Sequence, residues 1–358
     1  MSQGPTMTGG TRIAVWGAVL AAGLAAPFLF PSFLQQIGTL WVFIVFALTW
    51  DLTGGQMGYN SFGNVVFIGV GMYACAVTQV GLFYSVSEYT AARGGGTSFI
   101  WDMPQYLGGL GLGLAVAAAL AVVAALALGS LVLGMRGHYF AICTLGLGVA
   151  AGELAAGWEW IGAGSGFSPA SPPDELDVNR FYYYLAMALA IATFFAIRWI
   201  LSTRFGLAIN AIRDDEDKAE AMGLPTTRIK VTAWMFAALF LGMAGAIYGN
   251  MKRFIDPTEV AFAGATFGVW MVLMAILGGK GTLWGPVIGA VVFQVFNELF
   301  WTFLLGWQRV ALGLLIVLIV VFFPQGILGF MRERFPALFG HTVEPVVVAG
   351  EEPGGART

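Results

Sequence analysis

The chain has 358 residues, of which 58% are hydrophobic and only 10% are charged, and its mean hydropathy is +0.80. Soluble domains carry about 25% charged residues, so a chain this apolar could not cover its own surface in water, and most of it must face lipid. The net charge is −3 and the basic residues are scattered, which excludes a nucleic-acid-binding surface. Two histidines and two cysteines leave little material for a metal site or a disulfide framework. These properties indicate an all-α membrane protein that crosses the bilayer several times.

Apolar runs separated by polar residues or by Gly and Pro predict a bundle of about ten membrane-spanning helices. Lipid offers backbone groups no hydrogen-bond partners, so each crossing should be a helix of about 20 residues. The predicted spans are residues 12–32, 35–53, 61–84, 105–134, 138–157, 181–201, 229–251, 261–279, 283–305 and 308–330. Only a short Gly-rich link separates the eighth span from the ninth, so these two can form one hairpin or a re-entrant element.

The basic residues between the spans orient the bundle. If the N-terminus is cytoplasmic and all ten segments cross, twelve Lys and Arg residues lie on the inner side and five lie on the outer side. Cytoplasmic loops carry an excess of basic residues, so we expect both termini in the cytoplasm. We expect one membrane domain over residues 1–330. Residues 331–358 are polar, rich in Gly and Pro and without helical periodicity, which predicts a short flexible cytoplasmic tail.

The longest polar insertion, residues 202–230, lies between the sixth and seventh spans on the predicted cytoplasmic side. The acidic run 214–217 favours the start of a second short helix, because carboxylates stabilise the N-terminal end of a helix. Gly223 and Pro225 would end that helix, and one of the two threonines that follow could cap the next span. Helices this short are unstable alone. The insertion is therefore either a connector on the lipid headgroups or, as we favour, a docking element for a cytoplasmic partner.

Breaks within the apolar segments mark candidate positions along a transport pathway. Residues 54–73 contain six glycines and three polar side chains at the entry to the third span. Such an entry is typical of the broken helices that line transport pathways, although Gly69 and Gly71 fit close helix packing better. After the fifth span, glycines alternate with small residues over 162–166, so backbone amides could form a nest for a carboxylate, or simply an external turn.

Four acidic residues lie within or beside the predicted spans. Asp51, Glu159 and Glu298 stand near span ends, where water is close, whereas Glu153 is deeper and could face a cavity. The candidate pathway residues are therefore Asn60, Ser61, Asn64, Glu153, Gly164, Ser165 and Gly166.

The segment LGGKGT, residues 277–282, is superficially similar to a phosphate-binding loop. It lacks the spacing of that motif, which requires Gly, four residues and then Gly-Lys-Ser/Thr. The sequence also offers no catalytic cluster. We therefore expect no enzyme activity and no cofactor on this chain, and any ATP must be handled by another chain.

Taken together and in order, six segments resemble the LivM-type permeases of branched-chain amino acid ABC importers. The resemblance spans about residues 40–330, and its cytoplasmic segment is the most specific. The segments are GYNSFGNVVFIGVGMY (58–73), YFAICTLGLG (139–148), GAGSGF (162–167), RFGLAINAIRDDEDKAEAMGLPTTRIKVTAW (204–234), LGGKGTLWGPVIGA (277–290) and FFPQGILG (322–329).

The resemblance implies the channel-forming subunit of a type II-like importer in the bacterial inner (plasma) membrane. Its partners would be a homologous LivH-type permease, two cytoplasmic ATPase subunits that bind ATP and Mg²⁺, and a periplasmic or lipid-anchored solute-binding protein. Residues 202–228 would form the coupling loop that sits in a cleft of the ATPase. The residues this assigns to coupling are Arg204, Phe205, Gly206, Arg213, Asp214, Asp215, Glu216, Ala221, Met222 and Gly223.

Three departures from the family pattern leave the solute open. Members often have His where Asn64 stands, Glu where Val149 stands, and Thr-Gly-Gly where Ile161–Ala163 stands. We expect branched-chain or related amino acids, with urea or short-chain amides as the alternative. A self-contained channel or secondary transporter is a further alternative, which would need Glu153 for ion coupling and leaves the docking-like insertion unexplained.

Overall fold

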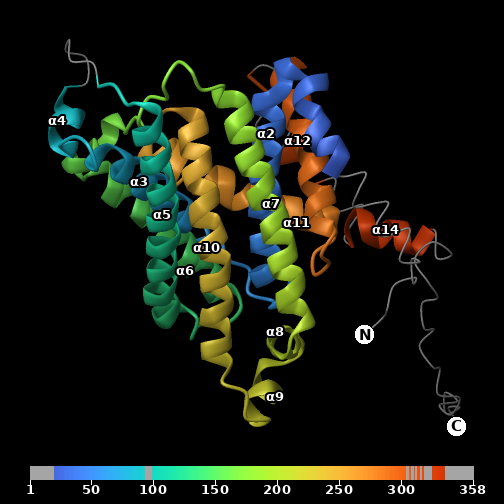
Figure 1. The fold of residues 1–358 in the computed structure, drawn as a ribbon. Coiled ribbons are helices and arrows are strands. Elements are labelled where there is room, and N and C mark those ends of the chain that lie inside the picture. The colour runs from blue at the N-terminus through green and yellow to red at the C-terminus, as the bar shows by residue number, and fades with distance from the viewer. Residues whose placement is uncertain are drawn as a thin grey trace, which may run out of the picture.

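Figure 1 shows the computed structural model as a bundle of long helices that run side by side, with a small helical lobe projecting from one end. The structure describes residues 20–92, 99–303 and 325–334, together with residues 306, 307, 310, 313, 314 and 317. Among these residues the regular structure is helical, apart from a single bridge between Phe167 and Ile255. This confirms the all-α prediction for the described part of the chain.

Seven helices in the described part are long and apolar enough to cross a membrane. They are Pro31–Gln56, which contains α2 (Leu34–Asp51), α5 (Met103–Val132), α6 (His138–Ala156), α7 (Val178–Ser202), α10 (Thr226–Lys252), Pro257–Gly278, which contains α11 (Val269–Gly278), and α12 (Gly285–Phe303). Two shorter apolar helices are Leu20–Leu29 and α3 (Val65–Gly81). These helices overlap the first nine predicted spans, several of them extending a few residues beyond the predicted bounds, and most of the tenth span lies outside the described residues.

The core of the bundle forms where α3, α5 and α10 pack against one another, with α2 lying against α7 and α10. A capping box between Asp102 and Gln105 begins α5. Close approach of the helices depends on small residues: a Cβ atom on Gly71 would collide with the backbone of Gly242, and one on Gly69 would collide with the Phe262 ring. The packing interpretation of these two glycines is therefore confirmed.

Two of the apolar segments are interrupted. After α2 the chain makes one π-helical turn, Leu52–Gln56, and residues 57–64 then run irregularly to α3. The segment before α11 contains two further π-helical turns, Pro257–Ala261 and Gly264–Gly268. The helices α11 and α12 pack together as a hairpin, and Asp51 accepts a 2.7 Å hydrogen bond from the Gly281 amide in the link between them.

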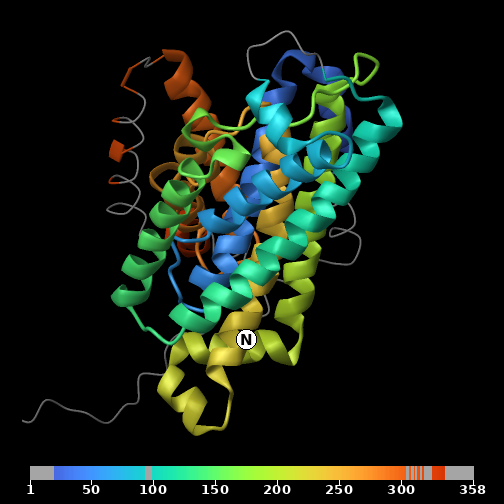
Figure 2. The same ribbon diagram turned by 90° about the vertical axis from the view of Figure 1, so that its left-hand side faces the viewer.

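The two ends of the bundle differ in character (Figure 2). One end carries the short helices α8 (Arg204–Asp214) and α9 (Glu216–Ala221), and the other carries α4 (Val86–Ala91) with the 3₁₀ turns Glu159–Ile161 and Ala163–Ser165. Beside α11 and α12 lies α14 (Gly326–Arg334). Helix therefore continues through residues 331–334 of the predicted tail, and the rest of that tail lies outside the described residues.

Candidate functional site

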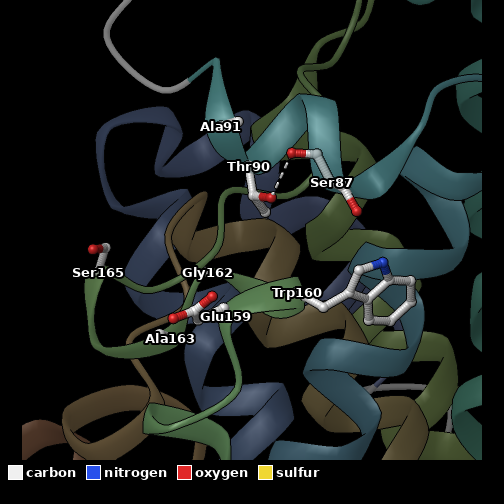
Figure 3. Close-up of a pocket in the computed structure, with 8 residues that line it drawn as sticks. All are labelled: Ser87, Thr90, Ala91, Glu159, Trp160, Gly162, Ala163 and Ser165. Atoms are coloured by element: carbon white, nitrogen blue, oxygen red, sulfur yellow. Dashed lines mark hydrogen bonds between the residues drawn. The ribbon is translucent and has the colours of Figure 1, made fainter.

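The predicted carboxylate nest lies at the end of the bundle that carries α4. Gly162, Ala163 and Gly166 adopt positive φ angles of 93°, 45° and 74°. Together with α4, this turn encloses a hollow of about 890 Å³, which Ser165 also lines. Figure 3 shows the carboxylate of Glu159 beside Gly162 and Ala163. That charge would repel an anion, so the electrostatics of the hollow disfavour a carboxylate-binding nest.

The other predicted pathway residues do not gather at this hollow. Asn64 is fully buried and its Oδ1 accepts a 2.8 Å hydrogen bond from the Trp234 indole. The Ser61 carbonyl accepts a 2.7 Å bond from the Trp50 indole, so both residues hold the irregular segment 57–64 against the bundle. Asn60 is exposed on that segment, near the α8–α9 end, and Glu153 is exposed on α6. Gly164 belongs to the turn at the hollow, between Ala163 and Ser165.

The polar insertion folds into two short helices, as the sequence predicts. Asp215 caps α9 by accepting a 3.0 Å hydrogen bond from the Lys218 amide. The same backbone bond and the Lys218 ammonium, 2.9 Å away, hold the pKa of Asp215 below its ordinary value. Gly223 follows α9 with a φ of 84°. The capping prediction for α10 is wrong: Pro225 occupies the cap position, its carbonyl accepts from the Ile229 amide, and no side chain caps the helix.

The α8–α9 lobe has a buried side and an exposed side. Gly206, Ile209 and Ile212 face inward, and a Cβ atom on Gly206 would lie 2.7 Å from the Ile200 carbonyl oxygen. Met222 is 84% exposed at the tip and Leu207 is 50% exposed. The remaining predicted coupling residues on the exposed side are Arg204, Arg213, Asp214, Ala221 and Gly223, whereas Phe205, Asp215 and Glu216 are half-buried. An exposed Met and Leu among charged side chains are typical of a protein-binding surface.

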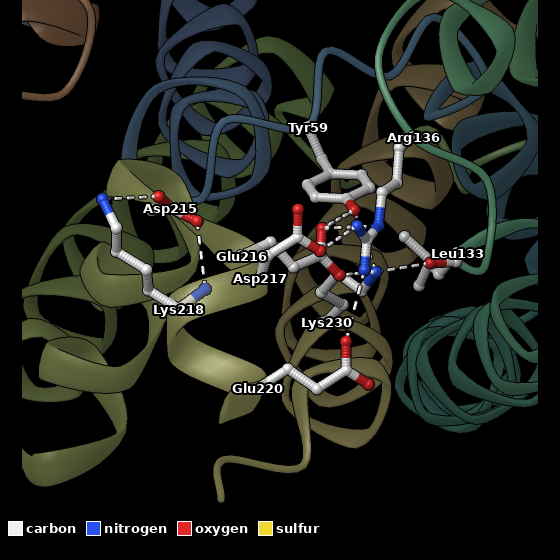
Figure 4. A network of polar contacts seen from close by, with 9 residues as sticks. All are labelled: Tyr59, Leu133, Arg136, Asp215, Glu216, Asp217, Lys218, Glu220 and Lys230. Atoms are coloured by element: carbon white, nitrogen blue, oxygen red, sulfur yellow. Dashed lines mark hydrogen bonds and ion pairs between the residues drawn. The ribbon is translucent and has the colours of Figure 1, made fainter. Parts of the chain in front are cut away.

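A buried lysine anchors this lobe to the bundle (Figure 4). Lys230 of α10 is 1% exposed, and its three N–H groups each find an acceptor. Its Nζ lies 2.6 Å from the Leu133 carbonyl oxygen, 2.9 Å from the Tyr59 hydroxyl and 2.6 Å from Glu216 Oε1. The Tyr59 hydroxyl in turn donates to the second oxygen of Glu216. The ammonium charge is therefore neutralised and fully hydrogen-bonded inside the protein.

Arg136, in the turn between α5 and α6, joins the same cluster from the surface. Its guanidinium pairs with Asp217 and lies 3.3 Å from Glu220 and 3.7 Å from Glu216. The bond to Asp217 and the neighbouring carboxylates raise the pKa of Arg136. Burial acts to raise the pKa of Glu216, but the hydrogen bonds from Lys230 and Tyr59 outweigh burial. The pKa of Glu216 therefore lies below its ordinary value. The carboxylate stays ionised at neutral pH.

We call Tyr59, Arg136, Glu216 and Lys230 the anchor cluster. It joins four parts of the fold: α9, α10, the irregular segment 57–64 and the α5–α6 turn. Of its members, only Glu216 was predicted as a coupling residue. A lysine just inside a predicted span was the available signal for the cluster, since a charge at such a position requires a partner.

Seven apolar helices in one bundle, with a charged two-helix lobe at one end, define a multi-pass membrane protein. A family model described as "Branched-chain amino acid transport system / permease component" matches residues 32–322, and the chain belongs to this family.

Its relatives are transport permease components rather than enzymes. The chain is 29% identical to the high-affinity branched-chain amino acid transport system permease protein LivM of Salmonella typhimurium, over 86% of this chain and 76% of that protein. The LivM protein of Escherichia coli K12 gives the same identity and coverage. LivH of Salmonella typhimurium is 30% identical over 48% of this chain and 53% of its own length. No solved structure matches.

Proposed function

We propose that this chain is a permease subunit of an ATP-binding cassette importer in the bacterial inner membrane. Its solute is a branched-chain or related amino acid. Its partners are a homologous LivH-type permease, two cytoplasmic ATPases that carry ATP and Mg²⁺, and a solute-binding protein outside the membrane. The similarity to LivM over most of the chain supports this assignment, and the similarity to LivH supports a second, related permease.

The observation that carries the proposal is the pairing of an exposed α8–α9 lobe with a buried anchor. The exposed side, with Met222 and Asp214, is the surface that docks into an ATPase. The lobe is then cytoplasmic, and so are the chain termini. When ATP binding draws the two ATPases together, the lobe moves, and the anchor cluster passes that displacement to α10, to the α5–α6 turn and to segment 57–64. Helices that move as rigid bodies about such joints switch a bundle between outward and inward openings.

Surface substitutions on the lobe test this proposal. The double variant D214K/M222E reverses one exposed charge and places another on the apolar tip, without touching the anchor cluster. We expect the assembled importer to lose uptake and solute-stimulated ATP hydrolysis by at least about tenfold, because burying an unpaired charge at an interface costs several kcal/mol. D174K, a charge reversal at an exposed position in the loop before α7, is the control. Normal coupled uptake by D214K/M222E contradicts the docking role.

A further inference from the structure

A second cavity lies between α2, α10 and α12, at the end of the bundle opposite the α8–α9 lobe. Its volume is about 410 Å³, within the range of small-molecule sites. Lys252 ends α10 on one side of it, and Glu298 lies on α12 on another. Neither the predicted pathway residues nor the anchor cluster lines this cavity.

The apolar part of the cavity is aromatic. Phe43 and Tyr248 are nearly inaccessible to solvent, at 2% and 6% exposed, and both line the cavity together with Trp270. The rings of Phe43 and Trp270 meet edge to face at 5.7 Å, which fixes their positions. Rigid aromatic walls of this kind accommodate an aliphatic side chain.

Three residues that line the cavity have side-chain oxygens that are inaccessible to solvent and have no hydrogen-bond partner in the described part of the chain: Gln36 Oε1, Gln294 Oε1 and Asn297 Oδ1. Gln294 and Asn297 are 6% and 7% exposed, so water does not freely compensate them. The orientation of the Gln294 amide is fixed chemically, because its Nε2 donates a 2.9 Å bond to Glu298 and its oxygen must therefore point elsewhere. The Gln294 amide therefore holds the Glu298 carboxylate in place beside the cavity.

The cavity also carries one charge of each sign. Glu298 contributes a carboxylate that accepts a hydrogen bond from the Gln294 amide, and the exposed Lys252 contributes an ammonium group 5.3 Å from the Tyr248 ring centroid. No ion pair joins Lys252 to an acidic group among the residues that the structure describes. A carboxylate, an ammonium group and an aromatic wall at one cavity match the three parts of an apolar amino acid, which are its ammonium group, its carboxylate and its side chain.

We propose that this cavity is a subsite for a zwitterionic α-amino acid with an apolar side chain. The ligand ammonium group donates to the Glu298 carboxylate. The ligand carboxylate pairs with Lys252, and the side chain packs on the aromatic wall. The inference deepens the proposed importer function, on which it rests, by naming a site within this chain. It also separates amino acids from urea and short amides, which can hydrogen-bond to Lys252 and Glu298 but carry no charges to balance theirs.

Equilibrium binding of L-leucine to the full-length chain with its co-purifying subunits tests the subsite. The protein is placed in nanodiscs of phosphatidylglycerol, which has no ammonium group, so that a lipid headgroup cannot supply the same chemistry. Each of two competitors keeps one of the two charged groups of leucine: 3-methylbutylamine has only the ammonium group, and 4-methylpentanoate has only the carboxylate. No solute-binding protein is added.

Substitution of Glu298 and substitution of Lys252 should weaken the binding of different ligands. E298Q weakens the binding of leucine and 3-methylbutylamine by at least about tenfold, because a hydrogen bond to a charged group contributes about a factor of ten in affinity or more. The affinity for 4-methylpentanoate stays unchanged. K252Q weakens the binding of leucine and 4-methylpentanoate and leaves the affinity for 3-methylbutylamine unchanged. Arg253, the exposed neighbour of Lys252, does not line the cavity, so R253Q is the matched control and leaves all three ligands unchanged.

The contrary outcomes are equally distinct. Leucine binding unchanged in both variants, or an equal loss of all three ligands in each, overturns the subsite. Absence of saturable leucine binding to the wild-type protein overturns it as well. If coupled uptake persists in any of these cases, the importer assignment stands without the subsite. If no ATPase co-purifies, the importer assignment fails, and the affinities of the two variants for the three ligands still test the subsite.

Discussion

Lys230 provides the most demanding test of how the lobe is anchored. In K230M the side chain keeps its length and loses its charge, so Glu216 loses its 2.6 Å partner and the Leu133 carbonyl loses its donor. Removing one partner of a buried ion pair typically costs 3–5 kcal/mol. We expect about 3 kcal/mol, at the low end of that range, because the Glu216 side chain is 12% exposed and keeps Arg136 at 3.7 Å.

A buried thiol reports this loss of stability. Cys75 is fully buried and Cys143 is half-buried, so in a C143S background a thiol-reactive dye reacts at Cys75 when the bundle opens. We expect K230M to shift the thermal transition of dye labelling downward by several degrees and to uncouple ATP hydrolysis from uptake. K218M, which removes an exposed lysine from the same lobe, should leave the thermal transition unchanged.

A second substitution separates charge burial from packing. The double variant K230M/E216Q leaves no unpaired ion, so it should recover part of the stability that K230M loses. Recovery of stability without recovery of coupling would indicate that the anchor transmits movement through its ionic contacts. The reasoning is refuted if K230M melts like the wild type and couples normally.

Two further predictions follow from the same contacts. Because the pKa of Glu216 is lower in the folded protein than in the unfolded chain, its contribution to stability is complete above the ordinary glutamate value, about 4.3, and is lost as the pH falls through the lowered value. The thermal transition of the wild type, followed by tryptophan fluorescence, should therefore fall in acid and should depend less on pH in E216Q. Substituting Gly71 by Ala should destabilise the bundle, since the added methyl group meets the backbone of Gly242, whereas G108A, with no heavy atom within 4 Å, should not; equal transitions for the two variants would contradict the packing account.

Much of the fold follows from composition and periodicity. Long apolar runs predict helices because lipid leaves the backbone no other partner, and the bounds of α5 and α6 agree with the expected spans within a few residues. The lobe was also predictable, since an acidic run followed by Gly223 and Pro225 gives local start and stop signals for α9. Such signals act over a few residues, and the sequence displays them directly.

The candidate sites were harder to foresee because their contacts are long-range. Lys230 meets acceptors 97 and 171 positions earlier in the chain, and no periodicity within α10 identifies them. The sequence predicts Asn64 and Ser61 as pathway residues, and it gives no sign that they accept hydrogen bonds from the Trp234 and Trp50 indoles. Glu298 suggested an interfacial position, and its cavity depends on how α2, α10 and α12 meet.

The assembly itself is the central claim, and co-purification tests it most directly. The tagged chain is extracted from its native membrane in mild detergent, and the subunits that accompany it are identified and counted by mass spectrometry. The importer account predicts one further permease of the same family and two ATPases. Recovery of the chain alone or as a homo-oligomer, under conditions that keep a known importer intact, would contradict it and favour a self-contained channel.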